Sequence, residues 1–203
     1  MTRNLRRKLL RDLRQNFVQF LAIFVMCFMA MYIMVTFDAD ITGVGHSTDE
    51  YYKETNFVDL LMYSEGFTPE DIITIRSVPS VKDVELRYTS VGRIMLGGAE
   101  KKLEYNFIDG NDISSMLLME GVPYESGKSG IWIDRNFAAK QGISIGDNLQ
   151  LKCDGIEFAE TVMGIMDNPD HIYFMIDDSY LEPEYGAYGF AFLDSGEYPG
   201  TEP

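Results

Sequence analysis

The sequence is poor in the residues that form disulfides and transition-metal sites. It contains two cysteines and two histidines in 203 residues. Cys27 lies inside a long apolar run and Cys153 lies after it, so no disulfide can form within the region that follows the run. His46 and His171 are far apart and belong to no His-x-x-x-His or paired-cysteine pattern. We therefore predict no zinc site, and we interpret His46 as a solvated loop residue and His171 as a structural one.

Sequence motifs for nucleotide binding and hydrolysis are also missing. The chain has no P-loop glycine pattern with Lys-Ser/Thr and no Gly-x-Ser-x-Gly motif. Residues 109–112 (DGND) superficially suggest a calcium loop, but they lack the alternating acids and distal Glu of an EF-hand, so a turn with a helix cap is favoured. We predict no catalytic, cofactor-binding or metal-ligating residue, and no enzyme activity. Four acids are interpreted as solvated surface residues: Asp167, Asp170, Asp177 and Asp178.

The longest feature of the sequence is an apolar run. Residues 17–37 contain no Asp, Glu, Lys or Arg. As a helix they extend about 31 Å, at roughly 1.5 Å per residue, which matches a hydrocarbon core of about 30 Å. A buried core helix would carry a polar stripe, whereas only Gln19 and Thr36 are polar here. A cleavable signal peptide has a shorter apolar region and a small-residue cleavage site. We predict an uncleaved transmembrane helix at 17–37.

The charges on either side of this run differ in sign. Residues 1–37 carry a net charge of +5 and the remainder −20, which gives the total of −15. Basic flanks stay on the cytoplasmic side of a membrane. We expect a plasma-membrane protein with a cytoplasmic amino terminus and its main domain outside the cytoplasm. The basic residues are Arg3, Arg6, Arg7, Lys8, Arg11 and Arg14.

Residues 1–16 combine these charges with an apolar face. Leu5, Leu9, Leu13 and Phe17 recur at every fourth position, which predicts a basic amphipathic helix on the inner membrane surface, attracted by anionic lipid headgroups. A basic run can also bind nucleic acid. Six charges joined directly to a span are more simply an orientation signal, and the acidic remainder disfavours polyanions. We expect the lipid bilayer as a partner and no nucleic acid.

The rest of the chain is long enough for one globular domain. We interpret residues 38–55 as a connector or helical stalk and 56–194 as an extracytoplasmic domain with its own core. Trp132 is expected to anchor that core, with a surface aromatic for a partner as the alternative. The predicted strands are 57–63, 84–96, 103–109, 131–133, 149–153, 156–166, 171–176 and 188–193, and the predicted helices are 69–78, 112–119, 135–141 and one turn capped by Asp177.

These elements define the fold class and its turns. Short helices among many strands indicate a β-rich α+β domain after the amino-terminal helix. Thr68 and Asp134 are expected to cap helices, and Gly142 is expected to end one in a left-handed conformation. Tight turns are predicted at 97–98 and 154–155.

The order of these motifs resembles the FtsX/MacB-type ABC transporter permease family. Residues 110–130 follow the family's G-x-D pattern and the helix and loop after it. Residues 131–164 contain the strand IWI, the helix RNFAAKQ, the segment GISIGD, a hairpin and VMGIM, and 77–84 (SVPSVKDV) is similar to the family's entry into a strand. Each motif is structural, and their order carries the resemblance.

The resemblance implies a MacB-like extracytoplasmic core domain in a mechanotransmission permease. A separate cytoplasmic ABC ATPase would drive it, with a second permease half or subunit and a peptide, lipoprotein or envelope protein as substrate. Family members have at least three further spans, so we expect this chain to be an amino-terminal fragment in which 195–203 is a truncated linker. The alternative is a single-span, membrane-anchored extracytoplasmic domain that binds a ligand or partner. A third hypothesis is an anchored hydrolase.

Overall fold

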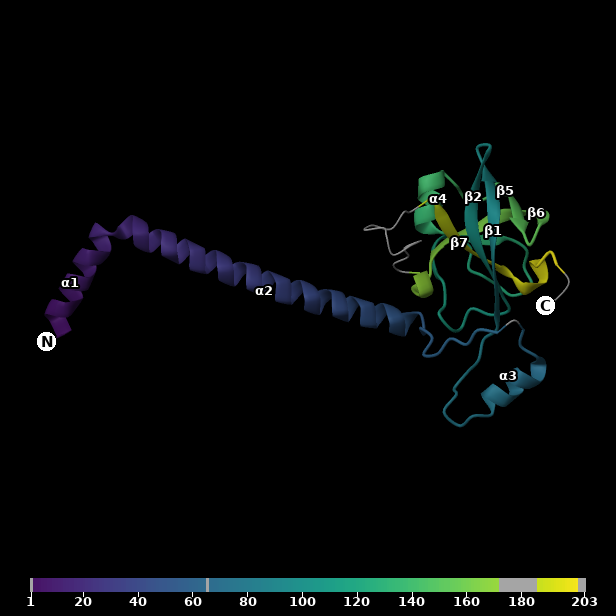
Figure 1. The fold of residues 1–203 in the computed structure, drawn as a ribbon, viewed down its shortest axis with the longest axis horizontal. Helices are drawn as coiled ribbons and strands as arrows, with labels where there is room; N and C mark the ends of the chain where they lie inside the picture. Colours follow the sequence, from purple (N-terminus) through teal and green to yellow (C-terminus); the bar gives the residue numbers. More distant parts are fainter. Residues whose placement is uncertain (1, 65, 172–185, 201–203) are drawn as a thin grey trace. The chain divides into compact units, whose positions relative to one another are not determined.

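The computed structural model describes residues 2–64, 66–171 and 186–200 (Figure 1). The chain divides into two compact units, Met1–Glu50 and Tyr51–Pro203.

The first unit contains helix α1 (Thr2–Gln15) and most of helix α2 (Phe17–Glu54). The two helices meet at Asn16, whose backbone N–H and side-chain amide both donate to the Asp12 carbonyl, at 3.0 and 3.2 Å. The Asn16 carbonyl in turn accepts from the N–H groups of Gln19 and Phe20. Asn16 therefore ends one helix and begins the next.

Within the described residues, α2 is the one helix long and apolar enough to cross a membrane. None of its residues is buried by protein. The core helix of a soluble fold would hide its apolar side chains, whereas Phe24 and Met26 are exposed to 66% and 73%. The helix continues past Phe37 to Glu54. Of the two alternatives expected for residues 38–55, a connector or a helical stalk, the structure therefore shows the helical stalk.

The second unit is built around seven strands (Figure 1): β1 (Arg87–Leu96), β2 (Ala99–Ile108), β3 (Leu117–Gly121), β4 (Ile131–Asp134), β5 (Asn148–Cys153), β6 (Ile156–Asp167) and β7 (Tyr188–Asp194). Their order in the sheet is β3-β6-β4-β7-β2-β1-β5, and β5 also pairs with β6. Because of this last pairing, six strands close into a small barrel, and β3 lies beside β6 outside the ring.

The strands form where apolar and polar residues alternate in the sequence. In β2, Leu103, Tyr105 and Phe107 point into the barrel and are buried, as are Leu149 and Leu151 of β5. A ring of strands with one apolar face can bury that face without a covering layer. The hydrophobic core of the domain therefore lies inside the barrel.

One glycine is required for this packing. A Cβ added at Gly92 of β1 would lie 2.1 Å from the Lys152 carbonyl oxygen and 2.5 Å from the Tyr105 ring. The bare backbone at this position lets β5 and the tyrosine approach β1. The Tyr105 hydroxyl then donates to the Arg93 carbonyl at 2.7 Å.

A second, smaller core lies on the outside of the barrel. It contains Ile108, Trp132, Met166 and Phe192, with Tyr124 packed edge-on to the tryptophan at 5.2 Å between ring centroids. The Trp132 indole N–H donates to the Val122 carbonyl at 2.8 Å. Trp132 is 2% exposed, so the prediction that it anchors a core is confirmed.

Helices α3 (Pro69–Arg76) and α4 (Arg135–Gln141) of the second unit begin where the sequence predicts, but α3 ends at Arg76, two residues before its predicted end at residue 78. Helix α3 has a reciprocal capping box between Thr68 and Asp71, and helix α4 is capped by Asp134. Gly142 follows α4 with φ of 70°. Apolar residues of α4 are buried against the barrel core. The α+β fold class, with a β-rich domain after an apolar helix, is confirmed.

Two predicted elements are wrong. Residues 112–119 do not form a helix: Leu117–Gly121 is strand β3, because these residues pair with the last part of β6. Asp112 caps no helix, and its N–H donates to Glu85. Residues 57–63 form no strand, because they have no strand neighbour among the described residues.

The other expected elements either match the structure or lie outside it. Strands β1, β2 and β4–β7 and the turns at 97–98 and 154–155 are present, although β1 begins at Arg87. Of the strand expected at 171–176, only His171 is among the described residues, and it ends the 3₁₀ turn η1 (Pro169–His171). The helical turn expected after Asp177 lies outside the described residues. Part of the expected linker 195–203 forms η2 (Ser195–Glu197).

Candidate functional site

The carboxyl end of α2 is fastened to the barrel domain by hydrogen bonds. The last turn of α2 belongs to the second unit, and Thr55, which follows it, is 1% exposed. The Thr55 N–H and hydroxyl both donate to the Tyr51 carbonyl, at 2.9 and 2.8 Å. Asn56 then takes φ of 49°, a left-handed conformation that asparagine tolerates. The chain turns sharply here, at the point where the helix ends.

Five hydrogen bonds join this turn to residues 111–116, which we name the junction loop. The Ser115 N–H and hydroxyl donate to the Thr55 carbonyl at 2.8 and 3.0 Å. The Ser114 N–H donates to the Asn56 carbonyl at 3.0 Å, and the Asn56 amide donates to the Asp112 carbonyl at 2.7 Å. The Val58 N–H donates to the Ser114 hydroxyl at 3.2 Å. The turn after α2 is thus held by main-chain and side-chain groups together.

An arginine holds the other side of the junction loop. Arg87 of β1 forms ion pairs with Glu85 at 3.0 Å and with Asp170 at 2.9 Å. Its guanidinium also donates to the carbonyls of Ile113 and Ser114, and it lies over the Phe192 ring at 5.7 Å. We name Glu85, Arg87 and Asp170 the Arg87 cluster.

The Arg87 cluster is largely shielded from water. The three side chains are 10–17% exposed. The second carboxylate oxygen of Glu85 accepts from the N–H groups of Asp112 and Ile113, at 3.1 and 3.0 Å. Removing one partner from such a group leaves a buried charge unpaired, which costs about 3–5 kcal/mol. The cluster therefore fixes the junction loop against β1 and η1.

Another ion pair lies close to the last turn of α2. Arg135 of α4 pairs with Asp167 of β6 at 2.9 Å. Burial raises the pKa of Asp167, and Arg135 opposes this rise. Burial, followed by the charge of Asp167, raises the pKa of Tyr51 to about 12. The Tyr51 hydroxyl is thus neutral and sits in an acidic environment at the end of the helix.

A separate polar cluster lies on the outer face of β2. Glu104 pairs with His171 at 3.4 Å and accepts from the Tyr188 hydroxyl at 2.9 Å. The His171 ring stacks on Phe190 with centroids 3.6 Å apart. Burial raises the pKa of Glu104, but the hydrogen bonds and charge of His171 and the Tyr188 hydroxyl together lower it below its ordinary value. This packing agrees with the prediction that His171 has a structural role.

The structure corrects the interpretation of two acids. Asp167 and Asp170 were expected to be solvated, but their side chains are 21% and 17% exposed and each is paired with an arginine. Asp167 is the last residue of β6 and Asp170 lies in η1, and α4 and β1 supply the arginines that pair with them. Asp177 and Asp178 lie outside the described residues. His46 is exposed, as expected, but it lies in helix α2 and not in a loop, with Glu50 one turn further along at 3.9 Å.

Residues 109–112 do not take the predicted turn-and-cap form. The Asn111 side chain accepts from the Met116 N–H at 2.8 Å, which closes the junction loop on itself.

The described residues, 2–64, 66–171 and 186–200, contain no group of three or more His, Cys, Asp or Glu side chains that could hold a metal ion.

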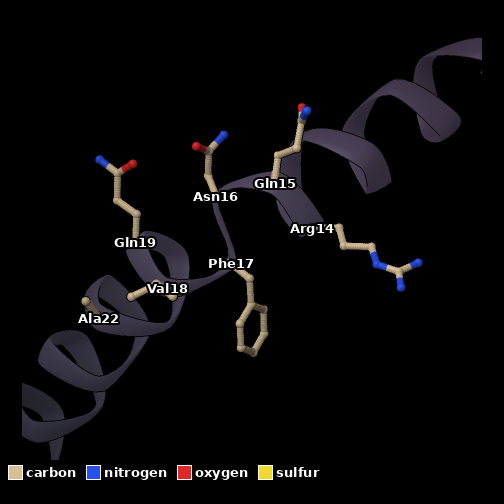
Figure 2. A pocket seen from close by; sticks show the side chains of 7 residues that line it. All are labelled: Arg14, Gln15, Asn16, Phe17, Val18, Gln19 and Ala22. Carbon is tan, nitrogen blue, oxygen red and sulfur yellow. The ribbon is translucent and has the colours of Figure 1, made fainter.

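A hollow in the first unit lies at the break between α1 and α2 (Figure 2). Its lining includes Arg14, Asn16 and Phe17, and Figure 2 shows the arginine and the phenylalanine pointing away from the Asn16 amide. The polar groups of this hollow do not converge on a common point. We therefore place the candidate site at the junction loop.

The junction site was not predicted from the sequence. Glu85 and Arg87 alternate in the predicted strand 84–96, so their shared face was available as a signal. Thr55, Ser114 and Ser115 carry no recognisable motif, and the contacts between them join positions about 60 residues apart.

No protein-family model matches the chain, and no curated protein matches it. One similar solved structure is the extracellular domain of the noncanonic ABC-type transporter YknZ from Gram-positive bacteria, with 16% identity and a TM-score of 0.44 over 64% of this chain and 63% of that one. Another is the periplasmic region of MacB from Actinobacillus actinomycetemcomitans, with 10% identity and a TM-score of 0.41 over 69% of this chain and 62% of that one. The chain thus spans less than two thirds of either structure. Both structures are domains of the kind that the sequence resemblance names.

Proposed function

We propose that the chain is the amino-terminal part of an ABC transporter permease subunit of the FtsX/MacB type. In this proposal α2 crosses the plasma membrane, α1 lies on the cytoplasmic surface, and the barrel domain lies outside. A separate cytoplasmic ATPase supplies the energy, and a second permease half or subunit completes the transporter. The chain itself performs no catalytic step.

The observation that carries this proposal is the way α2 ends. A flexible Gly/Ser linker would let a domain reorient freely and would transmit little displacement. Here the residues after the helix are hydrogen bonded to the junction loop, and the Arg87 cluster fixes that loop to the barrel. A displacement of the last turn of α2 therefore acts on the barrel through Thr55 and Asn56.

The direct test uses the full-length gene product and its ATPase in lipid nanodiscs. We expect ATP hydrolysis to change the rate of hydrogen exchange at the Ser114 and Ser115 amides, because the junction loop transmits the displacement of α2 to the barrel. Insertion of a short Gly-Gly-Ser linker after Glu54 should abolish this change while ATP is still hydrolysed. The same insertion between Gly97 and Gly98, in an exposed hairpin turn, is the control and should leave the change intact.

Two results would argue against coupling through the junction. One is hydrogen exchange at the junction loop that does not respond to ATP in an active complex. The other is a linker variant that behaves like the protein without the insertion.

The alternative function is a single-span anchored domain that binds a ligand or partner. Four consecutive exposed apolar residues, Leu60–Tyr63, favour a binding role. Reading the gene beyond Pro203 separates the two functions. Three or more further spans and a neighbouring ATPase gene support the permease, whereas an intact reading frame without them supports the anchored binder.

A further inference from the structure

The junction loop also contacts η1, the 3₁₀ turn that follows β6. Asp170 of η1 pairs with Arg87 at 2.9 Å, and Arg87 donates to the Ser114 carbonyl of the junction loop at 3.4 Å. The side-chain amide of Asn168, just before η1, donates to the same carbonyl at 3.4 Å, and Asn168 is 5% exposed. The position of η1 therefore affects how firmly the junction loop is held.

Hydrogen bonds within η1 join its residues into one unit. The Asn168 side chain accepts from the Asp170 N–H at 2.8 Å, and the Asn168 carbonyl accepts from the His171 N–H at 3.2 Å. A displacement of His171 therefore moves the two residues through which η1 contacts Arg87 and the junction loop.

The end of η1 lies on the outer face of β2 and β7. His171 pairs with Glu104 of β2 at 3.4 Å, and both side chains are 17% exposed. The imidazole ring stacks on Phe190 of β7 with centroids 3.6 Å apart. The other carboxylate oxygen of Glu104 accepts from the Tyr188 hydroxyl at 2.9 Å. The ring is thus held beside a carboxylate that is itself fixed in place.

The two charged residues of η1 differ in how their ion pairs respond to pH. Asp170 faces a guanidinium, which stays protonated at any pH near neutrality. His171 faces a carboxylate, and histidine is the side chain whose charge ordinarily changes between about pH 5 and 8. One attachment of η1 is therefore permanent, whereas the other has its full strength only while His171 carries a proton.

Other ionisable groups surround His171. Asp134, the N-cap of α4, is close enough that the charge of His171 opposes the rise that burial causes in the Asp134 pKa. The Tyr188 hydroxyl is neutral, because burial and Glu104 raise its pKa. The remaining charged groups around these residues are ion pairs: Asp170 with Arg87, and Asp167 with Arg135. Acids thus outnumber bases around the ring, which favours a positive charge there.

We propose that η1 is a proton-dependent clamp on the junction loop. When His171 is charged, its pair with Glu104 holds η1 on β2, and Asn168 and Asp170 keep the junction loop ordered. When His171 is neutral, η1 is held more weakly and the junction loop opens more often. The regulatory meaning rests on the proposed function, since acid outside the cell would strengthen the coupling of α2 to the barrel. The clamp itself is a property of this chain.

The test measures hydrogen exchange at the Ser114 and Ser115 amides of the whole protein in phosphatidylcholine nanodiscs, without ATPase or nucleotide. We compare about pH 5.5 with about pH 8 and correct for the intrinsic pH dependence of amide exchange. We expect these amides to be at least about threefold better protected at the lower pH, because the opening of the loop becomes rarer.

Glu160 must be removed from this measurement. Burial, together with Glu197, raises the pKa of Glu160 to about 7, so its protonation also stabilises the domain in this pH range. All proteins in the test therefore carry Glu160→Gln.

The two histidines of the chain provide a matched pair of variants. His171→Gln keeps a hydrogen-bond donor but carries no charge, and it should remove the pH difference at the junction loop. His46→Gln, at the exposed histidine of α2, should leave the difference intact. Glu104→Gln removes the partner charge and should act like His171→Gln, with no further effect when the two are combined. Trp132 fluorescence checks that each variant is folded.

Three results would overturn the proposal. The first is equal protection of the junction amides at the two pH values. The second is a pH difference that persists in His171→Gln or in Glu104→Gln. The third is a difference confined to the amides of Asp170 and His171, which would show that η1 does not act on the junction loop. If the clamp passes this test but the junction loop does not respond to ATP in an active complex, only the proposed function fails.

Discussion

Ser115 donates two hydrogen bonds to a single acceptor, the carbonyl oxygen of Thr55, from its N–H at 2.8 Å and its hydroxyl at 3.0 Å. This carbonyl lies just after the end of α2, where a helix leaves its last carbonyl groups without intrahelical partners. The junction loop supplies such partners from a distant part of the chain. The barrel domain therefore supplies the hydrogen-bond donors that the residue after the end of the helix needs.

Replacing Ser115 by alanine should lower the free energy of unfolding of the barrel domain by about 1 kcal/mol, because one of the two hydrogen bonds is lost. Denaturation of the whole protein in detergent, followed through the single tryptophan, Trp132, measures this. Ser80→Ala changes an exposed serine and is the control. An equal effect of both variants would mean that the hydroxyl of Ser115 adds nothing to the junction.

Replacing Arg87 by methionine should cost about 3 kcal/mol or more, because the carboxylates of Glu85 and Asp170 would remain buried without a counterion. The same change at Arg93, whose ion pair with Glu100 is about half exposed, should cost less than about 1 kcal/mol. The comparison uses the same denaturation measurement. Similar losses at the two sites would contradict the structural role of the Arg87 cluster.

Glu160 makes the stability of the domain depend on pH, and the direction of its pKa shift sets the sign of this dependence. Burial, together with a hydrogen bond and the charge of Glu197, raises the pKa of Glu160 from 4.5 to about 7. The folded state therefore binds a proton more tightly than the unfolded chain does. This residue's contribution to stability is greatest below pH 4.5 and is lost as the pH rises to about 7.

Glu160→Gln should remove that part of the pH dependence, so that unfolding free energy falls less between about pH 4.5 and 7. Denaturation curves over this range measure the change. Glu157→Gln, at an exposed residue on the same strand, is the control. If Glu160→Gln leaves the pH profile unaltered, Glu160 is not the group that titrates.

The barrel was largely predictable because its strands carry a period-two pattern. Leu103, Tyr105 and Phe107 alternate with polar residues, and Asp154-Gly155 marks the turn between β5 and β6. Closure of the ring and the position of β3 were not predictable, since both depend on which distant strand edges meet. Residues 57–63 show the limit of the pattern: they have strand-like residues, but the described part of the chain offers them no edge.

The candidate site was less predictable than the fold. Thr55 and Ser115 are small polar residues without a motif, and each matters only because the other lies opposite it. Asp167 and Asp170 looked like solvated acids in the sequence, and only the folded chain brings Arg135 and Arg87 to them.

The basic residues of α1 should set the orientation of the protein. Neutralising Arg3, Arg6, Arg7, Lys8, Arg11 and Arg14 together with glutamine should weaken retention of the amino terminus in the cytoplasm, because charge bias orients the first span. Protease digestion of inverted membrane vesicles measures this. An unaltered digestion pattern would count against the assignment.

The most direct test of the account asks on which side of the membrane the barrel domain lies. Single cysteines at Lys8 of α1 and Glu157 of β6, in a protein with Cys27 and Cys153 replaced by serine, are treated with a membrane-impermeant maleimide in intact cells. We predict that Glu157→Cys is labelled in intact cells and Lys8→Cys only after the membrane is opened. Labelling of Lys8→Cys with protection of Glu157→Cys, or recovery of both as freely soluble protein, would contradict the account.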